Sequence, residues 1–179
     1  MEVYELKIPK KRIAILVGKK GRDKRRLEKL MGCKIHVNSD GEVVIRGEDN
    51  LKCYECLNIV KAIGRGCNPD VATQLVNEEN CCEIIDITNY SGKNKAKKKR
   101  IKGRIIGRGG KIRKTIELLT ETNIVVYGKT VCIVGNMENV SIARNAVNDI
   151  LKGAPIGPVF SVINKKMKQL ISLENTNIY

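Results

Sequence analysis

The sequence is poor in aromatic residues. Five of its 179 residues are tyrosine, one is phenylalanine and none is tryptophan. RNA-recognition motifs stack bases on exposed aromatic side chains of a central strand, so the composition excludes that class of nucleic-acid-binding domain. Long hydrophobic runs are also missing. The longest aliphatic run, Ile13 to Val17, is far too short to cross a bilayer, and we expect no membrane contact.

Histidine is nearly absent too. His36 is the single histidine and falls on an expected strand, where a packed or exposed strand residue is the better interpretation. No serine or cysteine stands in a nucleophile–base pattern, and the carboxylates are scattered without a recognisable acid–base pair. We therefore expect no catalytic residues, no cofactor and no enzymatic activity.

Cysteine, in contrast, occurs seven times. The pair Cys53-x-x-Cys56 raises the alternative of a zinc site, but it lies inside an expected helix and no second C-x-x-C follows. Buried thiols are favoured, and no metal site is expected. The first residues do not form a basic and then apolar leader, so a cytoplasmic location with reduced thiols is expected.

Positive charge is concentrated in two windows. The formal net charge is +15, and Lys7 to Arg26 holds ten lysines and arginines with one acid, Asp23. Lys93 to Lys114 holds twelve lysines and arginines and no acid. Basic surface this concentrated predicts a polyanionic partner, with a solvated lysine-rich face as the less favoured alternative.

Each basic window contains a glycine loop, and the second loop carries the sharper signal. Ile105-Ile106-Gly107-Arg108-Gly109-Gly110-Lys111 places two cations among three glycines. Glycines let a ligand backbone approach the main chain closely. Apolar residues at helical spacing follow, so a helix starts at the loop and adds free N–H groups and a favourable dipole for an anion.

Two phosphate-binding motifs do not fit this loop. A nucleotide-binding P-loop needs Ser or Thr after Gly-Lys, but Ile112 follows Lys111. The dinucleotide pattern G-x-G-x-x-G would require glycine at Ile112. What remains resembles the G-x-x-G loop of KH domains, which holds about four nucleotides of single-stranded RNA or DNA.

The first basic window contains a second copy of this loop, Val17-Gly18-Lys19-Lys20-Gly21, which lies 89 positions earlier. Self-similarity sustained over about 30 residues indicates two related units. With the same offset, Leu27 aligns with Ile116, Glu28 with Glu117, Cys33 with Thr122, Ile35 with Ile124 and Val37 with Val126. An offset that is shorter by one residue aligns Gly47 with Gly135.

Apolar periodicity, caps and turns predict the order β-α-α-β-β-α in each unit, which matches the eukaryotic-type (type I) KH arrangement. In the second unit, a hairpin is expected across Gly128-Lys129. Leu27, Leu30 and Met31 are expected to face inward in the first unit, as is Leu51 on its long helix. The expected fold is α+β: two tandem type I KH domains joined by a short helix, with a C-terminal helix. The expected divisions are 1–67, a first KH domain; 68–80, a bridge with a helix over 70–79; 81–152, a second KH domain with an insertion over 89–99; and 153–179, a turn and a helix over 159–173 that packs on a KH domain or receives a partner.

The candidate RNA-binding residues lie in and around both loops. In the second unit, Lys102, Arg104, Arg113 and Lys114 are expected to meet neighbouring phosphates, and Ile105 and Ile106 to line the groove or core beneath the bases. The first loop has the same chemistry but a shorter basic run, so it ranks second. The loop residues themselves are Gly107, Arg108, Gly109, Gly110 and Lys111 in the second unit and Gly18, Lys19, Lys20 and Gly21 in the first.

Three stretches are more specific than a generic KH loop: Arg100 to Lys111, Val126-Tyr127-Gly128-Lys129-Thr130-Val131, and Gly153-Ala154-Pro155. They resemble the archaeal members of the partner-of-Nob-one family, which are small-subunit ribosome assembly factors. Eukaryotic members have lost the G-x-x-G loop of the first KH unit, whereas Gly18 to Gly21 retain it here. Whether the first unit contacts RNA or mainly protein partners therefore stays open.

The resemblance implies single-stranded RNA near the 3′ end of small-subunit rRNA as ligand. It implies the endonuclease that matures that end and the alpha subunit of translation initiation factor two as partners. A different class of function is an adaptor that binds proteins through its first domain and tail, with incidental RNA contact. The salt dependence of binding separates the two, because phosphate contacts release counterions and apolar contacts do not.

Overall fold

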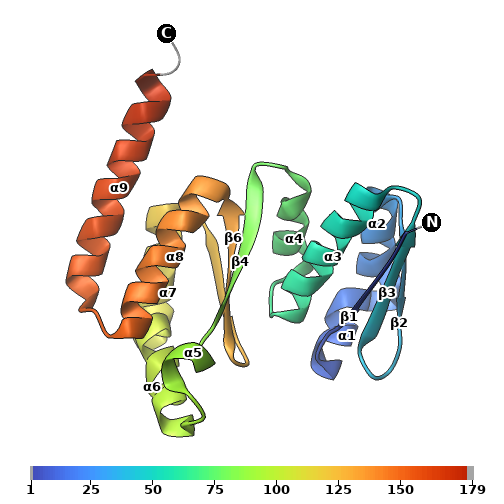
Figure 1. The fold of residues 1–179 in the computed structure, drawn as a ribbon, viewed down its shortest axis with the longest axis horizontal. Helices are drawn as coiled ribbons and strands as arrows, with labels where there is room; N and C mark the ends of the chain where they lie inside the picture. Colours follow the sequence, from blue (N-terminus) through green and yellow to red (C-terminus); the bar gives the residue numbers. More distant parts are fainter. Residues whose placement is uncertain (1, 177–179) are drawn as a thin grey trace. The chain divides into compact units, whose positions relative to one another are not determined.

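The computed structural model describes residues 2–176, with the side chains of residues 2–173. The chain divides between Cys82 and Glu83 into two compact units, and Figure 1 shows the elements of each. The first unit contains β1 (Glu2–Lys7), α1 (Lys10–Val17), the 3-10 turn η1 (Lys19–Gly21), α2 (Arg22–Met31), β2 (Lys34–Val37), β3 (Glu42–Gly47), α3 (Asn50–Gly64), α4 (Pro69–Ala72) and η2 (Thr73–Val76). The second contains β4 (Asn80–Asp86), which begins before the division, then α5 (Thr88–Ser91), α6 (Lys95–Ile106), η3 (Arg108–Gly110), α7 (Lys111–Thr120), β5 (Asn123–Tyr127), β6 (Thr130–Asn136), α8 (Met137–Lys152) and α9 (Ile156–Thr176).

The first unit has a three-stranded sheet in the order β1-β3-β2. β3 pairs antiparallel with both neighbours, with Leu6 opposite Val43 and Ile35 opposite Ile45. Alternate residues of a strand face opposite sides, so Ile35, Val43 and Ile45 lie together on one face, where they are fully buried. This face packs against α3, so the sheet and its helices share one core.

The second unit repeats this arrangement with the order β4-β6-β5. β5 and β6 form the expected hairpin, with Ile124 opposite Ile133. Gly128 in the turn has φ 55°, a left-handed conformation that glycine adopts without strain. The two units therefore confirm the α+β fold with two KH domains.

The long helix of each unit starts at a side-chain cap. Asp49 accepts a hydrogen bond from the Lys52 N–H at the start of α3, and Asn136 accepts one from the Glu138 N–H at the start of α8. Such caps pair amide groups that have no partner within the helix. The buried face of α8 is the one that its apolar periodicity predicts: Val140, Ala143, Ala146, Val147, Ile150 and Leu151.

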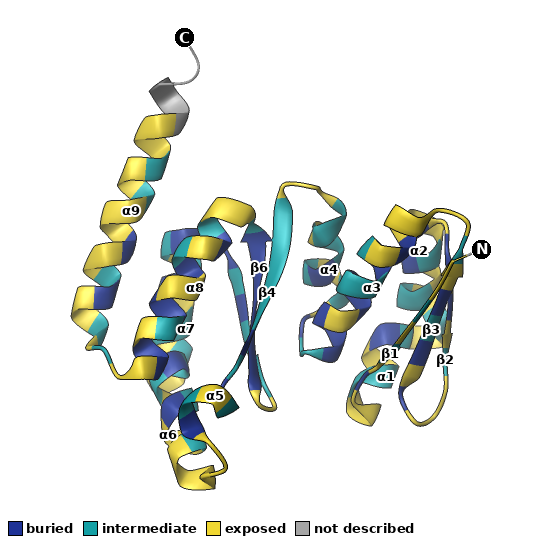
Figure 2. Cartoon of the chain, viewed as in Figure 1, coloured by how far each residue is buried: buried dark blue, intermediate teal, exposed yellow. Residues whose placement is uncertain are grey.

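The C-terminal helix α9 packs on α7 and α8 of the second unit, which was the favoured of its two expected roles. Val159 and Ile163 are buried, and both lie in its first half. The second half is largely exposed, including Ile171 and Leu173 (Figure 2). Within residues 2–176, no helix has the length and apolar character needed to cross a membrane.

Three local expectations were wrong. Leu30 is 47% exposed and Leu51 is 63% exposed, so neither faces the core. The side chains buried on this part of α3 are those of Cys53 and Cys56, the thiols that were expected to be buried. The helix expected over 70–79 is instead α4 followed by η2, and both pack on α3. Asn77 ends η2 with an extended backbone, and β4 begins three residues later.

Candidate nucleic-acid interface

The two glycine loops have the same backbone conformation. Gly18 has φ 69° and ψ 175°, and Gly107 has φ 73° and ψ 174°. Glycine alone adopts this region, since a Cβ atom there clashes with the backbone. The first glycine of each loop is therefore required by the fold itself, whatever the loop binds.

The loop tips follow the same path with different residues. Gly109 has φ 59° and ψ 20°, and Lys20 takes nearly the same values, φ 53° and ψ 29°. A Cβ atom on Gly109 would meet nothing within 4 Å. The tip of the second loop is thus open to a ligand, and the first unit demonstrates that a side chain fits this conformation.

Matching hydrogen bonds hold each loop. Gly107 N–H donates to Gly103 O at 2.8 Å, and Gly110 N–H donates to Gly107 O at 3.1 Å. The loop leads directly into α7, which has no acid in its first turn. Lys111 N–H donates to Arg108 O, and the N-terminus of α7 places the positive end of the helix dipole beside the loop. This is a geometry that binds phosphate.

Isoleucines form the apolar base of the second loop. Ile105 and Ile116 are fully buried in the core, whereas Ile106 is half-buried beside the loop. Ile112 packs so closely on Gly107 that a Cβ atom there would lie 2.7 Å from Ile112 Cγ1. Of the two isoleucines expected beneath the bases, Ile105 belongs to the core and Ile106 reaches the surface.

Arg113 has a role that the sequence interpretation missed. Its guanidinium lies 2.9 Å from Glu117 Oε1 and donates to Ile124 O at 2.9 Å, while Ile124 N–H donates to Glu117 Oε1 at 2.7 Å. These bonds join α7 to the edge strand β5, so the Arg113 guanidinium already has an acid and a backbone carbonyl as partners within the fold.

The first unit contains the same network at the positions 89 residues earlier. Lys24 lies 3.0 Å from Glu28 Oε1 and donates to Ile35 O at 2.8 Å, and Ile35 N–H donates to Glu28 Oε1 at 2.8 Å. The recurrence of a base and an acid four residues apart in both units was the signal in the sequence that could have identified this structural role.

Arg104 is also used by the fold. Its guanidinium donates to Ala154 O at 2.6 Å, in the turn that follows α8. In the first unit Arg12 serves a similar purpose, since it donates to Ile63 O at 2.8 Å and to Cys67 O at 2.5 Å after α3. Arg104 therefore holds in place the turn that follows α8.

The other expected cations of the second loop face solvent. Arg108, Lys111 and Lys114 are exposed and have no ion pair among residues 2–173. Lys102 is half-buried, and burial together with the nearby charge of Lys98 lowers its pKa. The surface beside the second loop thus carries positive charge that the chain itself does not neutralise.

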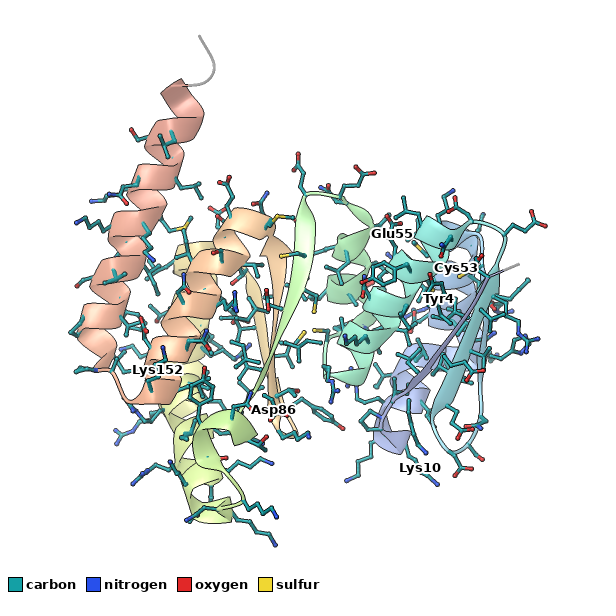
Figure 3. The ribbon with its side chains drawn as sticks, in the orientation of Figure 1. Tyr4, Lys10, Cys53, Glu55, Asp86 and Lys152 are labelled. Atoms are coloured by element: carbon teal, nitrogen blue, oxygen red, sulfur yellow. The ribbon has the colours of Figure 1, made fainter. Side chains whose placement is uncertain are left out.

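The first unit neutralises much of its basic window. Lys10, at the start of α1 in Figure 3, lies 2.7 Å from Asp40. Arg25 donates to the loop carbonyls of Gly21, at 3.2 Å, and Lys20. The remaining ion pairs of this window are Arg22–Asp23 at 2.9 Å, Lys24–Glu28 at 3.0 Å and Arg26–Asp70 at 2.7 Å.

An acid lies directly on the first loop. Asp23, which is equivalent to Ile112, packs on Gly18, and a Cβ atom there would lie 2.1 Å from Asp23 Oδ2. Asp23 and Asp70 both line a hollow of about 430 Å³ beside Gly18. Lys19 and Lys20 at the loop tip stay exposed. A phosphate at the first loop would therefore meet a carboxylate that the second loop lacks.

The cysteines of α3 are packed in the core. Burial raises the pKa of Cys53, and the hydrogen bond with Cys33, together with burial, raises that of Cys56. Among residues 2–173, no group of three histidines, cysteines, aspartates or glutamates is placed to hold a metal ion. The two thiols of C-x-x-C are protonated core side chains.

Comparison with known proteins identifies both units. Residues 3–62 match the KH domain model, and residues 81–168 match the model described as the eukaryotic-type KH domain, or KH domain type I. A KH domain-containing protein of Methanocaldococcus jannaschii is 43% identical over 169 residues, which cover 92% of this chain and 74% of that protein. The RNA-binding protein PNO1 of Oryzias latipes is 33% identical over 117 residues, 65% of this chain and 48% of that protein.

The chain belongs to the archaeal partner-of-Nob-one (PNO1/Dim2) family. A solved structure of a PNO1/Dim2 protein agrees over nearly the whole chain. It is the complex of translation initiation factor two alpha, Dim2p and rRNA from Pyrococcus horikoshii. Its match has a TM-score of 0.86 at 40% identity and covers 94% of this chain and 95% of that chain. Relatives in the PNO1/Dim2 family are named as RNA-binding proteins, and this solved relative was crystallised with rRNA.

Proposed function

We propose that this chain is a non-catalytic assembly factor of the small ribosomal subunit that holds single-stranded RNA at its second glycine loop. The observation that carries the proposal is the open loop Gly107–Gly110 at the start of α7, surrounded by exposed and unpaired cations. Loop amides and Arg108 bind phosphates, and Lys111 and Lys114 extend the charge along the backbone.

The bases lie against the aliphatic side of the groove. Ile106 and Ile112 provide an apolar surface next to the loop, and no aromatic side chain among residues 83–173 is classed as exposed. Three or four unstacked bases contact this surface and expose their edges for recognition. The combination favours single strands over duplexes, because paired bases cannot leave the stack without cost.

The proposed RNA is the 3′-end region of small-subunit rRNA. The Pyrococcus horikoshii relative, at 40% identity, was solved together with rRNA and the alpha subunit of initiation factor two. We assign both partners to this chain on that similarity. The endonuclease that matures the 3′ end is a further proposed partner.

The first unit is the better candidate for protein contact. Tyr4 and Tyr54 pack with ring centroids 6.2 Å apart, and Tyr4 bonds to Asn50. Tyr54 and Leu51 are exposed on the same face of α3. Exposed tyrosine and leucine side chains are typical of protein interfaces, and the acid on the first loop disfavours phosphate there.

The test is fluorescence anisotropy with a labelled oligonucleotide that matches the 3′ end of small-subunit rRNA, beside a scrambled one. The expected result is tighter binding to the matching oligonucleotide, with a log–log salt slope of about −3 for four phosphate contacts. Equal binding to both would leave a generic RNA binder. A flat salt dependence would support the adaptor instead.

A further inference from the structure

The helix that precedes the second glycine loop, α6, is longer than α1, the helix that precedes the first loop. Measured back from the first loop glycine, α6 has 12 residues and α1 has 8. The extra turn begins at Lys95, and Asn94 caps it by accepting a hydrogen bond from Lys97 N–H at 2.9 Å. Because the cap is well formed, this turn is a built part of the unit.

Four lysines of this helix form a stripe that ends at the loop. Ile101 and Ile105 face the core, so the helical period of 3.6 residues places the lysines together on a neighbouring face with Ile106. The members of this lysine stripe are Lys95, Lys98, Lys99 and Lys102. Side chains that end in nitrogen project from this end of the unit in Figure 3.

The stripe is costly to the helix in the absence of an anion. Its lysines follow one another at spacings of three and four residues, and like charges at these spacings repel one another and destabilise a helix. Lysines in the first turn also oppose the helix dipole, and α6 has no acid there. None of the four lysines has an ion pair among residues 2–173.

The first unit shows that the fold does not require the stripe. Pro9, Lys10 and Ile13 stand at the positions of Lys98, Lys99 and Lys102, and the one lysine among them is paired with Asp40. Nothing in the KH core therefore explains the four unpaired charges of α6. The burial of Lys102 and its closeness to Lys98 lower its pKa, which is the effect expected of crowded positive charges.

We propose that the lysine stripe is a second phosphate-binding site, which contacts the RNA backbone beyond the nucleotides held at the glycine loop. The stripe runs from Lys102 to Lys95, about 10 Å along the helix at 1.5 Å per residue, and so leads away from the loop. It therefore lengthens the path for phosphates well past the roughly four nucleotides of one KH groove. This inference rests on the proposed RNA binding by the second loop.

The test measures the binding of two RNA lengths by two variants. Each variant loses three lysine charges, one in the stripe and the other on α9. One oligonucleotide has about five nucleotides, enough for one KH groove, and the other has about twelve with the same central sequence. The stripe variant is Lys95→Gln/Lys98→Gln/Lys99→Gln in the full chain. The matched control is Lys165→Gln/Lys166→Gln/Lys168→Gln on the exposed face of α9, which removes the same charge.

The stripe variant is expected to bind the longer RNA about tenfold more weakly and the shorter RNA within about twofold of the parent. Its salt slope on the longer RNA falls in magnitude by about 2, since three lost phosphate contacts contribute about 0.7 each. The control variant changes neither length by more than about twofold. Circular dichroism and thermal melts establish that both variants fold.

Three results would overturn the proposal: unchanged affinity for the longer RNA, equal losses for both lengths, or an equal loss in the α9 control. Unchanged RNA binding combined with lost binding of the initiation-factor alpha subunit would assign the stripe to a protein partner. The variant Arg108→Asp/Gly109→Asp tests the proposed function separately. If the glycine loop is the RNA site, this variant loses the shorter RNA. If it still binds the shorter RNA fully, the loop assignment is wrong, whatever the stripe variant shows.

Discussion

The two KH units have the same loop conformation, but they differ in how many of their basic side chains are paired with acids. Gly18 and Gly107 have dihedral angles within a few degrees of each other. Among residues 2–173, four cations of the first basic window pair with acids, whereas in the second window only Arg113 does. A loop geometry inherited by both units is therefore compatible with two functions, and the surrounding side chains decide between them.

The difference reaches the loop itself. Asp23 packs on the first glycine of one loop and Ile112 on the first glycine of the other. An acid within a few ångströms of a bound phosphate costs about 1 kcal/mol or more at a protein surface. In the second unit the same position holds Ile112, an apolar side chain that the proposed function places beside a base. The difference between aspartate and isoleucine at this position therefore changes both the charge and the polarity beside the loop.

The largest effect is expected when the loop tips are made acidic. Arg108→Asp/Gly109→Asp should weaken RNA binding about 100-fold, roughly 2.7 kcal/mol, because it replaces a phosphate donor with two carboxylates. Lys19→Asp/Lys20→Asp in the first loop should cost less than about threefold. Anisotropy with the 3′-end oligonucleotide measures both variants.

The acidic tips should leave the fold intact. Gly109 faces open space, and Lys20 already occupies the equivalent left-handed conformation, which aspartate also tolerates. Thermal melts provide the control. Equal losses from the two loops would break the distinction between the units.

An exchange of the residues that pack on the loop glycines should have an intermediate effect. Ile112→Asp should weaken RNA binding about tenfold, and the first unit shows that the backbone accepts aspartate there. Asp23→Ile, placed in the Arg108→Asp/Gly109→Asp chain, should restore part of the lost affinity through the first loop. No recovery would mean that Asp23 does not limit the first unit.

The smallest effect on RNA is expected at Arg113. Lysine fills the equivalent position in the first unit and makes the same bonds to an acid and to a strand carbonyl. Arg113→Lys should therefore leave RNA affinity within about twofold, because its charge is used inside the fold. Glu117→Ala should lower the free energy of unfolding by about 1–3 kcal/mol, since it leaves Ile124 N–H unpaired. A large loss of RNA binding in Arg113→Lys would instead indicate that Arg113 contacts the RNA.

The equivalent acid of the first unit makes stability depend on pH. Burial by itself raises the pKa of Glu28, but hydrogen bonds from Ile35 N–H and Lys24 outweigh it and hold that pKa below its ordinary value. The folded pKa lies below the unfolded one, near 4.3, so this contribution is complete above about pH 5 and is lost as the pH falls further. Urea unfolding at neutral and acidic pH should show a shallower acid dependence in Glu28→Gln, and an unchanged dependence would remove Glu28 from this role.

The fold was predictable from the sequence because its signals repeat. Two G-x-x-G loops 89 residues apart and matching apolar positions identified both units, and the turn at Gly128 identified the hairpin. The predictions that Leu30 and Leu51 are buried were wrong, because apolar character does not by itself place a side chain in the core. Leu51 lies in the first turn of α3 and is exposed, and helical periodicity alone did not separate it from the buried residues of that helix.

The site was only partly predictable. Composition showed where the cations gather, but it could not show which of them the fold already binds. Arg104 and Arg113 lie in the same basic window as Arg108, and only the structure reveals that each donates to a backbone carbonyl. Partners distant in sequence decide which charges remain available for RNA.

The most direct test is a map of backbone amide chemical shifts of the full chain as the 3′-end oligonucleotide is added. We predict that the largest changes fall on residues 106–112 and extend along α6, while residues 18–22 change little at the same RNA ratio. Equal changes at both loops, or changes confined to residues 18–22, would contradict the assignment of the second unit as the RNA clamp.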